Sequence, residues 1–448
     1  MPYRIVVALA VAWCVAFPLI GSWAQLHLFA DGGLFSYAVA AGDPWDFHWR
    51  QISGRMAAFL WASWPASAWG RLSGEPAWGV ALYAMLHFSA PACGFAAVWR
   101  ADRTGVIRLW AALSIVVLCP VTFGFPTELW TAHAAVWPAL ALFWTPGSRA
   151  RWAAATLALG VVVLSHEGGI VWAFVLLGAL ALSPGRAHAL SRATLSFGLT
   201  LAVWIACRTA FPPDPAEAEV LRLNAWNLLR VSRLWSPLML TLGAGLAVYG
   251  AALALRRGPV VAFGVAASGL ALWWTLLDKT LHAGDRYDLR TLLLGAVPVL
   301  MALAAAHAGG MGGKVLTPAL ARGAAGAVLL VTLAHGVETA KFVRVWRNYT
   351  ATIRALAAGD HTDPALGDGC FVSGARVPAR FAVVSWPATI PFLSVMVSEA
   401  YAPRHLVVHP ENGYFWFDCA AATANAAAPR ALPWRTREMV RVYTCGGR

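Results

Sequence analysis

Charged residues are scarce in this sequence, at 12% of 448 residues, and only 21 residues are acidic. Hydrophobic residues make up 59% of the chain. Apolar runs of about 20 residues, the length that crosses the hydrocarbon core of a bilayer, recur along most of its length. This composition excludes a protein that is soluble as a whole. It predicts an all-α polytopic membrane protein, because a helix satisfies its own backbone hydrogen bonds in lipid.

Ionisable residues are nearly absent from the predicted spans, where His87 is the main polar group, and the two halves of the chain are not alike. A transporter is expected to carry buried ionisable residues and an internal repeat, so both absences count against that class.

No cleavable signal peptide is evident. The first apolar run is long enough to span, and it lacks a small-residue cleavage site.

Basic residues give the chain a net charge of +13. Most of them fall in short loops between spans, such as the loop with Arg100, Arg103 and Arg108 and the loop with Arg149 and Arg151. Basic loops of this kind set orientation and meet anionic lipid. Membrane lipid is therefore an expected partner, and nucleic acid is not.

About eleven transmembrane helices alternate with these loops, at residues 5–24, 77–99, 109–124, 129–144, 153–165, 170–182, 193–210, 237–255, 260–277, 292–307 and 316–335. Residues 56–72 are short for a span and rich in Trp, Ser and Gly. They are predicted to lie on the membrane as part of an interfacial first outer loop, residues 25–75. The positive-inside rule then places the N-terminus in the cytoplasm.

Two domains are expected, a transmembrane domain over residues 1–340 and a small C-terminal α+β domain over residues 341–448, outside the cytoplasm. Short strands are predicted at residues 370–373, 381–386, 405–409 and 414–418, with a helix at residues 394–401. Cys370, Cys419 and Cys445 lie in the second domain. An oxidising compartment would let two of them pair, although the sequence does not indicate which two.

Titratable and aromatic side chains are concentrated in residues 29–55, directly after the first span. A carboxylate at the position of Asp31 can take a proton from an acceptor hydroxyl that arrives from water, while a lipid-borne donor waits in the membrane. Gly32 and Gly33 allow a ligand to approach the backbone closely. Asp31 is therefore a candidate general base. A second interpretation, compatible with the first, is that it caps a helix over residues 34–41.

Two further polar sites are predicted on the same side of the membrane. His166 and Glu167 stand in a short turn between hydrophobic runs, where such groups are costly unless paired or functional. A polar turn wetted by headgroup water is the alternative. In residues 278–290, Lys279, His282 and Arg286 oppose the positive-inside trend, and phosphate is their natural partner. Pairing with the aspartates of that loop is the alternative.

Taken together, these features resemble the GT-C superfamily of polytopic glycosyltransferases. Asp31, Tyr37 and the stretch at residues 40–43 are similar to its first outer loop, and Arg286-Tyr287 is similar to a late outer loop before a span. The resemblance covers the architecture of residues 1–340. The family often pairs two acidic residues in the first loop. Here Gly32 follows Asp31, which leaves open whether Asp43 or Asp46 supplies a second carboxylate.

The resemblance implies an inverting transfer of sugar from a polyprenyl-phosphate donor to a glycan, lipid-linked or protein acceptor at the outer face of a bacterial inner (plasma) membrane. Asp31 is expected to deprotonate the acceptor hydroxyl. The basic side chains Lys279, His282 and Arg286 are expected to stabilise the departing phosphate. His166 and Glu167 would orient the sugar or the acceptor, and the tail would select the acceptor. The expected substrate-binding residues are Tyr37, Asp43, Asp46, His48, Arg50, Lys279, His282, Arg286 and Tyr287.

No cofactor is firmly predicted. Ile170 stands at the fifth position from His166 and excludes the HExxH zinc motif, and no ligand set demands a metal, although a divalent metal is left open. Two other functions share the expected topology: a polysaccharide polymerase or ligase, and a lipid or glycan transporter without chemistry.

Overall fold

The computed structural model describes residues 2–42, 44, 54–145, 147–181, 183, 185–212, 283–308, 318–359, 371–386, 389–401 and 403–408. These residues are mostly helical, in agreement with the predicted fold class. The predicted spans at residues 237–255 and 260–277 and the predicted strand at residues 414–418 lie outside them. So do Cys370, Cys419 and Cys445.

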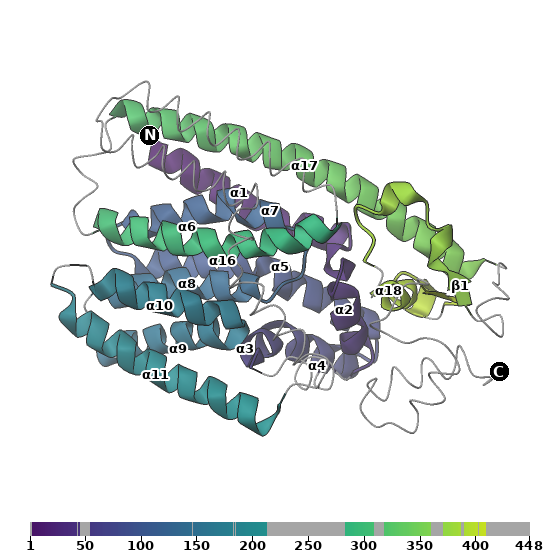
Figure 1. The fold of residues 1–448 in the computed structure, drawn as a ribbon, viewed down its shortest axis with the longest axis horizontal. Coiled ribbons are helices and arrows are strands. Elements are labelled where there is room, and N and C mark those ends of the chain that lie inside the picture. Colours follow the sequence, from purple (N-terminus) through teal and green to yellow (C-terminus); the bar gives the residue numbers. More distant parts are fainter. Residues whose placement is uncertain are drawn as a thin grey trace, which may run out of the picture.

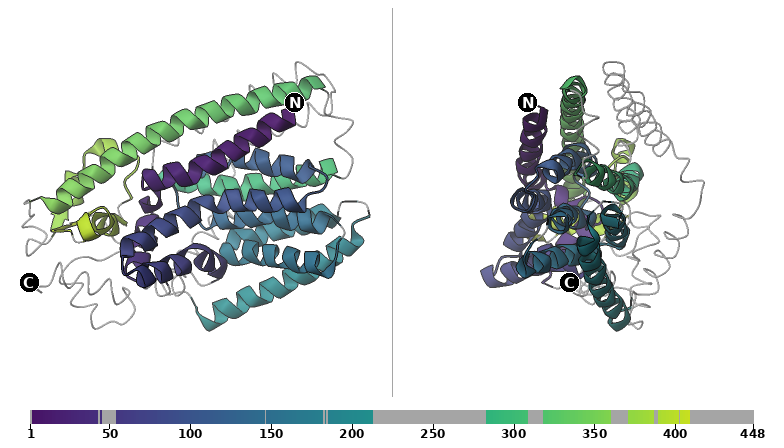
Figure 2. Two further views of the ribbon diagram at one scale, coloured as in Figure 1. Left: turned by 180° about the vertical axis from the view of Figure 1, so that it is seen from behind. Right: turned by 90° about the vertical axis from the view of Figure 1, so that its left-hand side faces the viewer.

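Helices of alternating direction form an elongated bundle (Figures 1 and 2). They are α1 (Pro2–Trp23), α5 (Pro76–Ala101), α6 (Val106–Val117), α8 (Leu129–Trp144), α9 (Arg149–Ser165), α10 (Glu167–Ala181), α11 (Ala187–Ala210) and α16 (Ala283–Ala306). Helix α8 is buried along nearly its whole length and packs against α5 and α9. The core of the bundle is rich in large aromatic side chains, among them the fully buried Trp130, Trp144 and Trp172.

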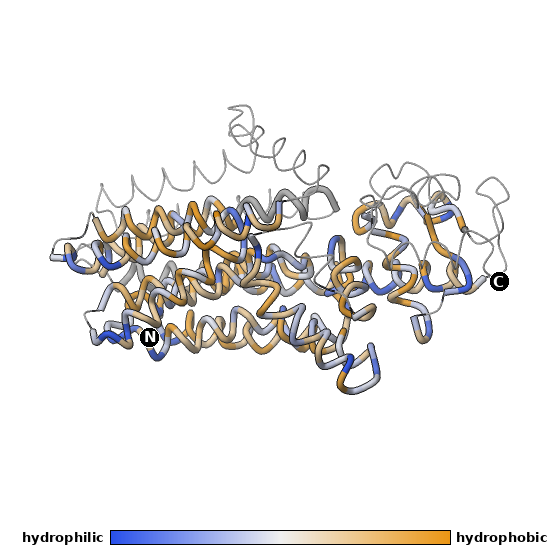
Figure 3. Tube along the Cα trace, turned by 90° about the horizontal axis from the view of Figure 1, so that it is seen from below, coloured by the Kyte–Doolittle hydropathy of each residue, from blue (hydrophilic) through white to orange (hydrophobic). Residues whose placement is uncertain are grey.

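Within the described residues, four helices are long and apolar enough to cross a membrane: Tyr3–Trp23, Pro76–Ala101, Ala187–Ala210 and Ala325–Ala358. Hydrophobic residues run along the helices of the bundle, and polar residues gather near the helix ends (Figure 3). Large apolar side chains such as Leu19 and Leu195 are exposed on the outer faces of α1 and α11. This pattern supports a membrane protein, because lipid favours exposed apolar side chains that water does not.

The two ends of the bundle differ in charge. At one end the basic turns meet the N-terminus: Arg151 donates to the carbonyl of Ala101, and Arg186 donates to the carbonyl of Trp144. The opposite end holds Asp31, Glu128 and Glu167, and we call it the site end. The alternating helix directions thus separate the basic loops from the predicted functional loops, as the sequence predicts.

Residues 56–73 are helical, in three pieces: α3 (Met56–Ala58), the π-helical turn η3 (Phe59–Ser63) and α4 (Trp64–Ser73). Helix α4 folds back against α5, and the two helices approach closely at Gly70 and Gly79, where a Cβ on Gly70 would lie 3.4 Å from Gly79 Cα. This segment is not among the four helices that are long and apolar enough to span. Its position at the membrane surface stays a prediction.

Two predicted segments are shaped differently in the structure. The span expected at residues 109–124 breaks after Val117, and the short α7 (Cys119–Thr122) follows with Pro120 near its start. Proline has no N–H to continue the helix, so the break falls there. The loop expected at residues 278–290 is helical from Ala283, because α16 begins there.

Helix α17 (Pro318–Ala358) is much longer than the span predicted at residues 316–335. Charged residues after 335 end an apolar run, yet they do not end a helix: Lys341 Nζ lies 2.9 Å from Glu338 Oε1, one turn away along α17. Residue 340 therefore falls inside a continuous helix, and the division into two domains at that point stays a prediction.

The C-terminal segment combines short helices with two strands. Strand β1 (Phe371–Ser373) pairs in parallel with β2 (Leu406–Val408), which confirms two of the predicted strands. The strand expected at residues 381–386 is wrong, because a 3-10 turn (Ala379–Phe381) and further turns occupy that stretch. The predicted helix is displaced: α18 covers Ile390–Met396, and it starts with Pro391 in its first turn.

Candidate functional site

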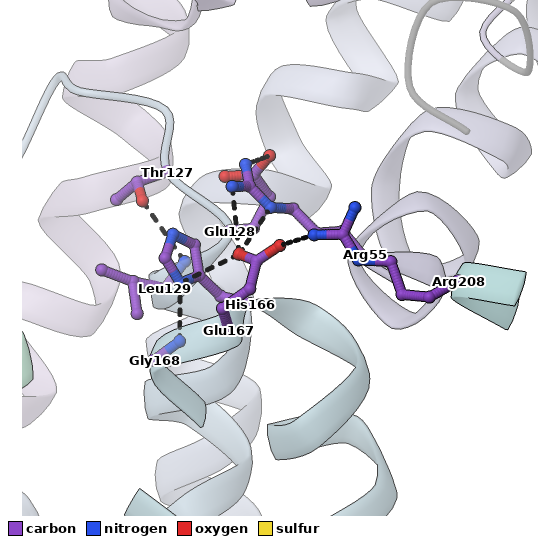
Figure 4. A network of polar contacts seen from close by, with 8 residues as sticks. All are labelled: Arg55, Thr127, Glu128, Leu129, His166, Glu167, Gly168 and Arg208. Atoms are coloured by element: carbon purple, nitrogen blue, oxygen red, sulfur yellow. Dashed lines mark hydrogen bonds and ion pairs between the residues drawn. The ribbon is translucent and has the colours of Figure 1, made fainter. Parts of the chain in front are cut away.

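A partly buried ion-pair cluster joins four separate parts of the chain at the site end (Figure 4). Arg55 donates from Nη1 to Glu128 Oε1 at 3.0 Å and from Nε to Glu167 Oε2 at 3.2 Å. Arg208 donates from Nη2 to Glu167 Oε1 at 2.7 Å. Both oxygens of Glu167 are thus held by arginines, and Arg55 links the two carboxylates.

Helix ends explain why these charges gather here. Glu128 is the residue before α8, and Glu167 is the first residue of α10, so both carboxylates lie at the positive ends of helix dipoles. Arg208 lies in the last turn of α11, where a cation is favoured. The charges of the cluster therefore also complement the helices that carry them.

Arg55 reaches the cluster because the chain before it passes very close to α11. Gly54 has φ +91°, and a Cβ on it would lie 2.7 Å from Trp204 Nε1 and 3.3 Å from Arg208 Nε. Only glycine accepts both that backbone conformation and that approach. Residues 54 and 55 of the first outer loop are therefore anchored on α11.

The cluster is largely shielded from water. The side chains of Arg55 and Glu128 are 11% and 8% exposed, and that of Glu167 is 26% exposed. Glu167 precedes the apolar stretch that begins at Ile170. Burial alone would raise the pKa of the Glu167 carboxyl, but Arg55, then His166 and a backbone hydrogen bond, and last Arg208 together outweigh burial and lower it to about 2.

This lowered pKa predicts a loss of stability in acid. A carboxyl with a folded-state pKa of about 2 and an ordinary value of 4.5 stabilises the fold fully above the ordinary value, and this contribution disappears as the pH falls toward 2. Wild type is expected to lose unfolding free energy between about pH 5 and about pH 2 more steeply than Glu167→Gln. Glu75→Gln, at an exposed residue of the same end, is the control and should keep the wild-type slope.

His166 is oriented by the turn that it belongs to. Its Nδ1 accepts a hydrogen bond from the backbone N–H of Gly168 at 3.0 Å. A nitrogen that accepts carries no proton, so the ring proton lies on Nε2 in this arrangement. The Nδ1 atom is 3.7 Å from Glu167 Oε2, and the two predicted residues lie in one polar cluster.

Gly168 and Gly169 bring α10 close to its neighbours. A Cβ on Gly169 would overlap the carbonyl oxygen of Val162 on α9, and one on Gly168 would overlap Leu294 of α16. Gly169→Ala is therefore expected to lower the free energy of unfolding by about 1–3 kcal/mol. Gly178→Ala on the same helix has open space around it and is expected to be neutral or stabilising, by up to about 1 kcal/mol. Equal effects of the two substitutions would contradict the tight crossing.

Asp31 occupies the turn between α1 and α2 (Gly32–Ala40). It stands in the N-cap position, but its side chain makes no capping hydrogen bond, and the helix begins at Gly32 rather than at residue 34. The predicted capping role is therefore wrong for the carboxylate. A Cβ on Gly32 would overlap the carbonyl oxygen of His27 and the Pro126 ring, so Gly32 serves chain packing here.

The buried Tyr83 lies near both Asp31 and Glu128. Glu128 and Asp31 both lie near enough to the Tyr83 hydroxyl for their charges to act on it. Tyr83 is 4% exposed and stacks on His87, with ring centroids 6.1 Å apart. Asp31 and Glu128 therefore share one neighbourhood, although they are 97 positions apart in the sequence.

The other predicted site residues fall into two groups. Tyr37 is buried, and its ring centroid lies 5.3 Å from that of Phe392. Arg286 and Tyr287 lie in α16, within its first two turns, where the structure describes the backbone. The remaining candidates lie outside the described residues: Asp43, Asp46, His48, Arg50, Lys279 and His282.

The sequence reasoning missed three members of the cluster, namely Arg55, Glu128 and Arg208. Arg208 lies at the end of an apolar run, where a basic residue usually marks the membrane–water interface and not a specific ion pair. Glu128 and Arg55 were part of polar loops with no indication of a specific partner. One detectable signal is an acidic residue at the start of each of two apolar helices, Glu128 at α8 and Glu167 at α10. A carboxylate is favoured at a helix N-terminus.

Comparison with known protein families, with curated proteins and with solved structures finds no match for this chain. Among the residues that the structure describes, no three His, Cys, Asp or Glu side chains gather as metal ligands. The functional argument therefore rests on the geometry of the site end.

Proposed function

We propose that this chain is a membrane-embedded glycosyltransferase of the GT-C kind. It transfers a sugar from a polyprenyl-phosphate donor to a glycan, a lipid-linked acceptor or a protein. One observation carries the proposal: the half-buried Asp31, between the apolar α1 and α2, lies at the same end of the bundle as a partly buried arginine–glutamate cluster. Perturbed, partly shielded charge at a membrane boundary is typical of a functional site.

In the proposed reaction Asp31 removes the proton from the acceptor hydroxyl. The acceptor oxygen then attacks the anomeric carbon, and the bond from that carbon to the phosphate oxygen breaks. The phosphate leaves with the bonding electrons as polyprenyl phosphate, and the configuration at the anomeric carbon inverts. Asp31 afterwards returns its proton to water.

The other residues in the proposal either bind the substrates or fix the side chains at the site end. Lys279, His282 and Arg286 would stabilise the leaving phosphate, and Tyr287 would contact the sugar. Glu167 already accepts hydrogen bonds from Arg55 and Arg208, which favours an indirect part for it, as the residue that fixes these arginines. His166 remains a candidate for direct contact with the sugar or the acceptor.

The proposed location is a bacterial inner membrane, with the N-terminus and the basic turns in the cytoplasm and the site end outside. The segregation of the basic turns to the N-terminal end of the bundle supports this orientation through the positive-inside rule. Labelling of single cysteines introduced at Arg103 and at Glu75, with a membrane-impermeant reagent on intact cells, tests it. The proposal predicts labelling at position 75 alone.

The experiment that tests the proposed function is transfer of labelled sugar from a panel of polyprenyl-phosphate donors by the purified full-length chain in lipid. At least one donor should be consumed, and parallel assays with a chelator or with added Mg²⁺ decide whether a metal takes part. If no donor is consumed and labelled lipid instead crosses the bilayer, the chain is a transporter and the proposal is wrong.

A further inference from the structure

Residues from the C-terminal third of the chain surround the backbone that carries Asp31. Phe29, two positions before Asp31, is fully buried. Its ring centroid lies 5.2 Å from that of Phe342 and 5.4 Å from that of Trp346, both in edge-on geometry and both on α17. Trp346 also donates from Nε1 to the carbonyl of Ala24, at 3.1 Å. Helix α17 thus holds the chain on its approach to Asp31.

A second contact holds the chain after Asp31. Helix α2 packs against α18 (Figure 1), where the fully buried Phe392 meets Tyr37. A Cβ on Gly33 would lie 3.7 Å from the backbone nitrogen of Leu393, so the two backbones approach closely at this point. Asp31 lies between these two packed contacts.

The backbone beside Asp31 is strained. Ala30 has φ 51° in the left-handed region, where the Cβ of an L-residue comes too close to the following carbonyl oxygen. Such a conformation persists only where the surroundings fix it, and it is common at functional sites. The contacts from α17 on one side and α18 on the other are the surroundings that fix it here.

We infer that α17 and α18 position Asp31, with Phe342, Trp346 and Phe392 as the positioning residues. The inference rests on the proposed function for its catalytic consequence, but the docking itself does not. The C-terminal segment is then a component of the Asp31 site. It positions Asp31 in addition to its expected role in selecting the acceptor. A small displacement of a general base is enough to slow proton transfer severely.

The test compares Phe392→Leu with Ser394→Ala in the full-length chain. Leucine keeps an apolar side chain against α2 but loses the ring contact with Tyr37. Ser394 is a matched control, because it is equally buried on α18 but faces β2, where it accepts from the backbone N–H of Val407 at 3.4 Å. Two readouts are taken: hydrogen exchange of the α2 amides, and kcat and KM for sugar transfer.

Phe392→Leu is expected to speed exchange at residues 33–40 and to lower kcat by about tenfold or more, with KM for the donor unchanged. Ser394→Ala should leave both as in wild type. Trp346→Phe, which keeps the aromatic ring but loses the bond to Ala24, should act in the same direction as Phe392→Leu.

Each contrary result has a distinct meaning. Unchanged exchange in Phe392→Leu and in Trp346→Phe would overturn the docking. Faster exchange with unchanged kcat would overturn the positioning role. A wild type that transfers no sugar from any donor would refute the proposed function and with it the catalytic consequence, whereas the docking would still be decided by exchange alone.

Discussion

Asp31→Asn is expected to lower sugar transfer by about a hundredfold or more, because it removes the factor that a general base supplies. The substitution is nearly isosteric. The carboxylate makes no capping hydrogen bond to α2, so the helix does not depend on it and the fold should survive. The measurement is the transfer rate from the donor that wild type consumes, at saturating acceptor.

The control for Asp31→Asn is Glu75→Gln, the same chemical change at an exposed residue of the site end. It should retain wild-type activity. Equal activity of Asp31→Asn and wild type would contradict the role of Asp31, and Asp43 and Asp46 would be the next carboxylates to test. A fall in activity for both variants alike would show that the loss is not specific to Asp31.

Removal of Arg55 is expected to have the largest effect on stability. Arg55→Met leaves Glu128 and part of Glu167 buried without their shared cation, and breaking a buried ion pair from one side typically costs about 3–5 kcal/mol. The measurement is the free energy of unfolding in mixed micelles. Arg55→Lys should also be destabilising, since an ammonium group cannot bond to two carboxylates with the planar fork of arginine.

Arg71→Met is the matched control, because Arg71 is exposed on α4 in the neighbouring segment. It should change the free energy of unfolding by less than about 0.5 kcal/mol. In the double variant Arg55→Met/Glu128→Gln, part of the loss should be recovered, because one unpaired charge is removed. Equal losses for Arg55→Met and Arg71→Met would show that the cluster does not stabilise the fold.

The architecture of the membrane part follows from the sequence to a large extent. Apolar runs located the helices, and their alternation with basic loops predicted which polar turns share an end of the bundle. The extended α17 was missed because hydropathy detects where a chain leaves an apolar environment, and a helix can continue beyond that point. Its segment after residue 335 carries Phe342 and Trp346, which pack against Phe29.

The candidate site could be predicted only in part. The sequence points to His166 and Glu167 because charge is costly beside an apolar run. Their partners Arg55 and Arg208 could not be assigned, because the sequence separates Arg55 from Glu167 by 112 positions and no local pattern encodes that pairing. The docking of α18 on α2 was hidden for the same reason: it depends on Gly33 and Phe392, which only the folded chain brings together.

The most direct test of the central claim is an analysis of the products formed from a polyprenyl-phosphate sugar labelled at its anomeric carbon. The proposed function predicts one polyprenyl phosphate for each sugar transferred, with the anomeric configuration of the glycosidic product inverted relative to the donor, as read by NMR. No turnover of this donor, together with turnover of a polyprenyl-diphosphate glycan that releases polyprenyl diphosphate, would instead indicate a polymerase or ligase. Intact donor recovered on the opposite leaflet would indicate a transporter, and either result would contradict the proposed function.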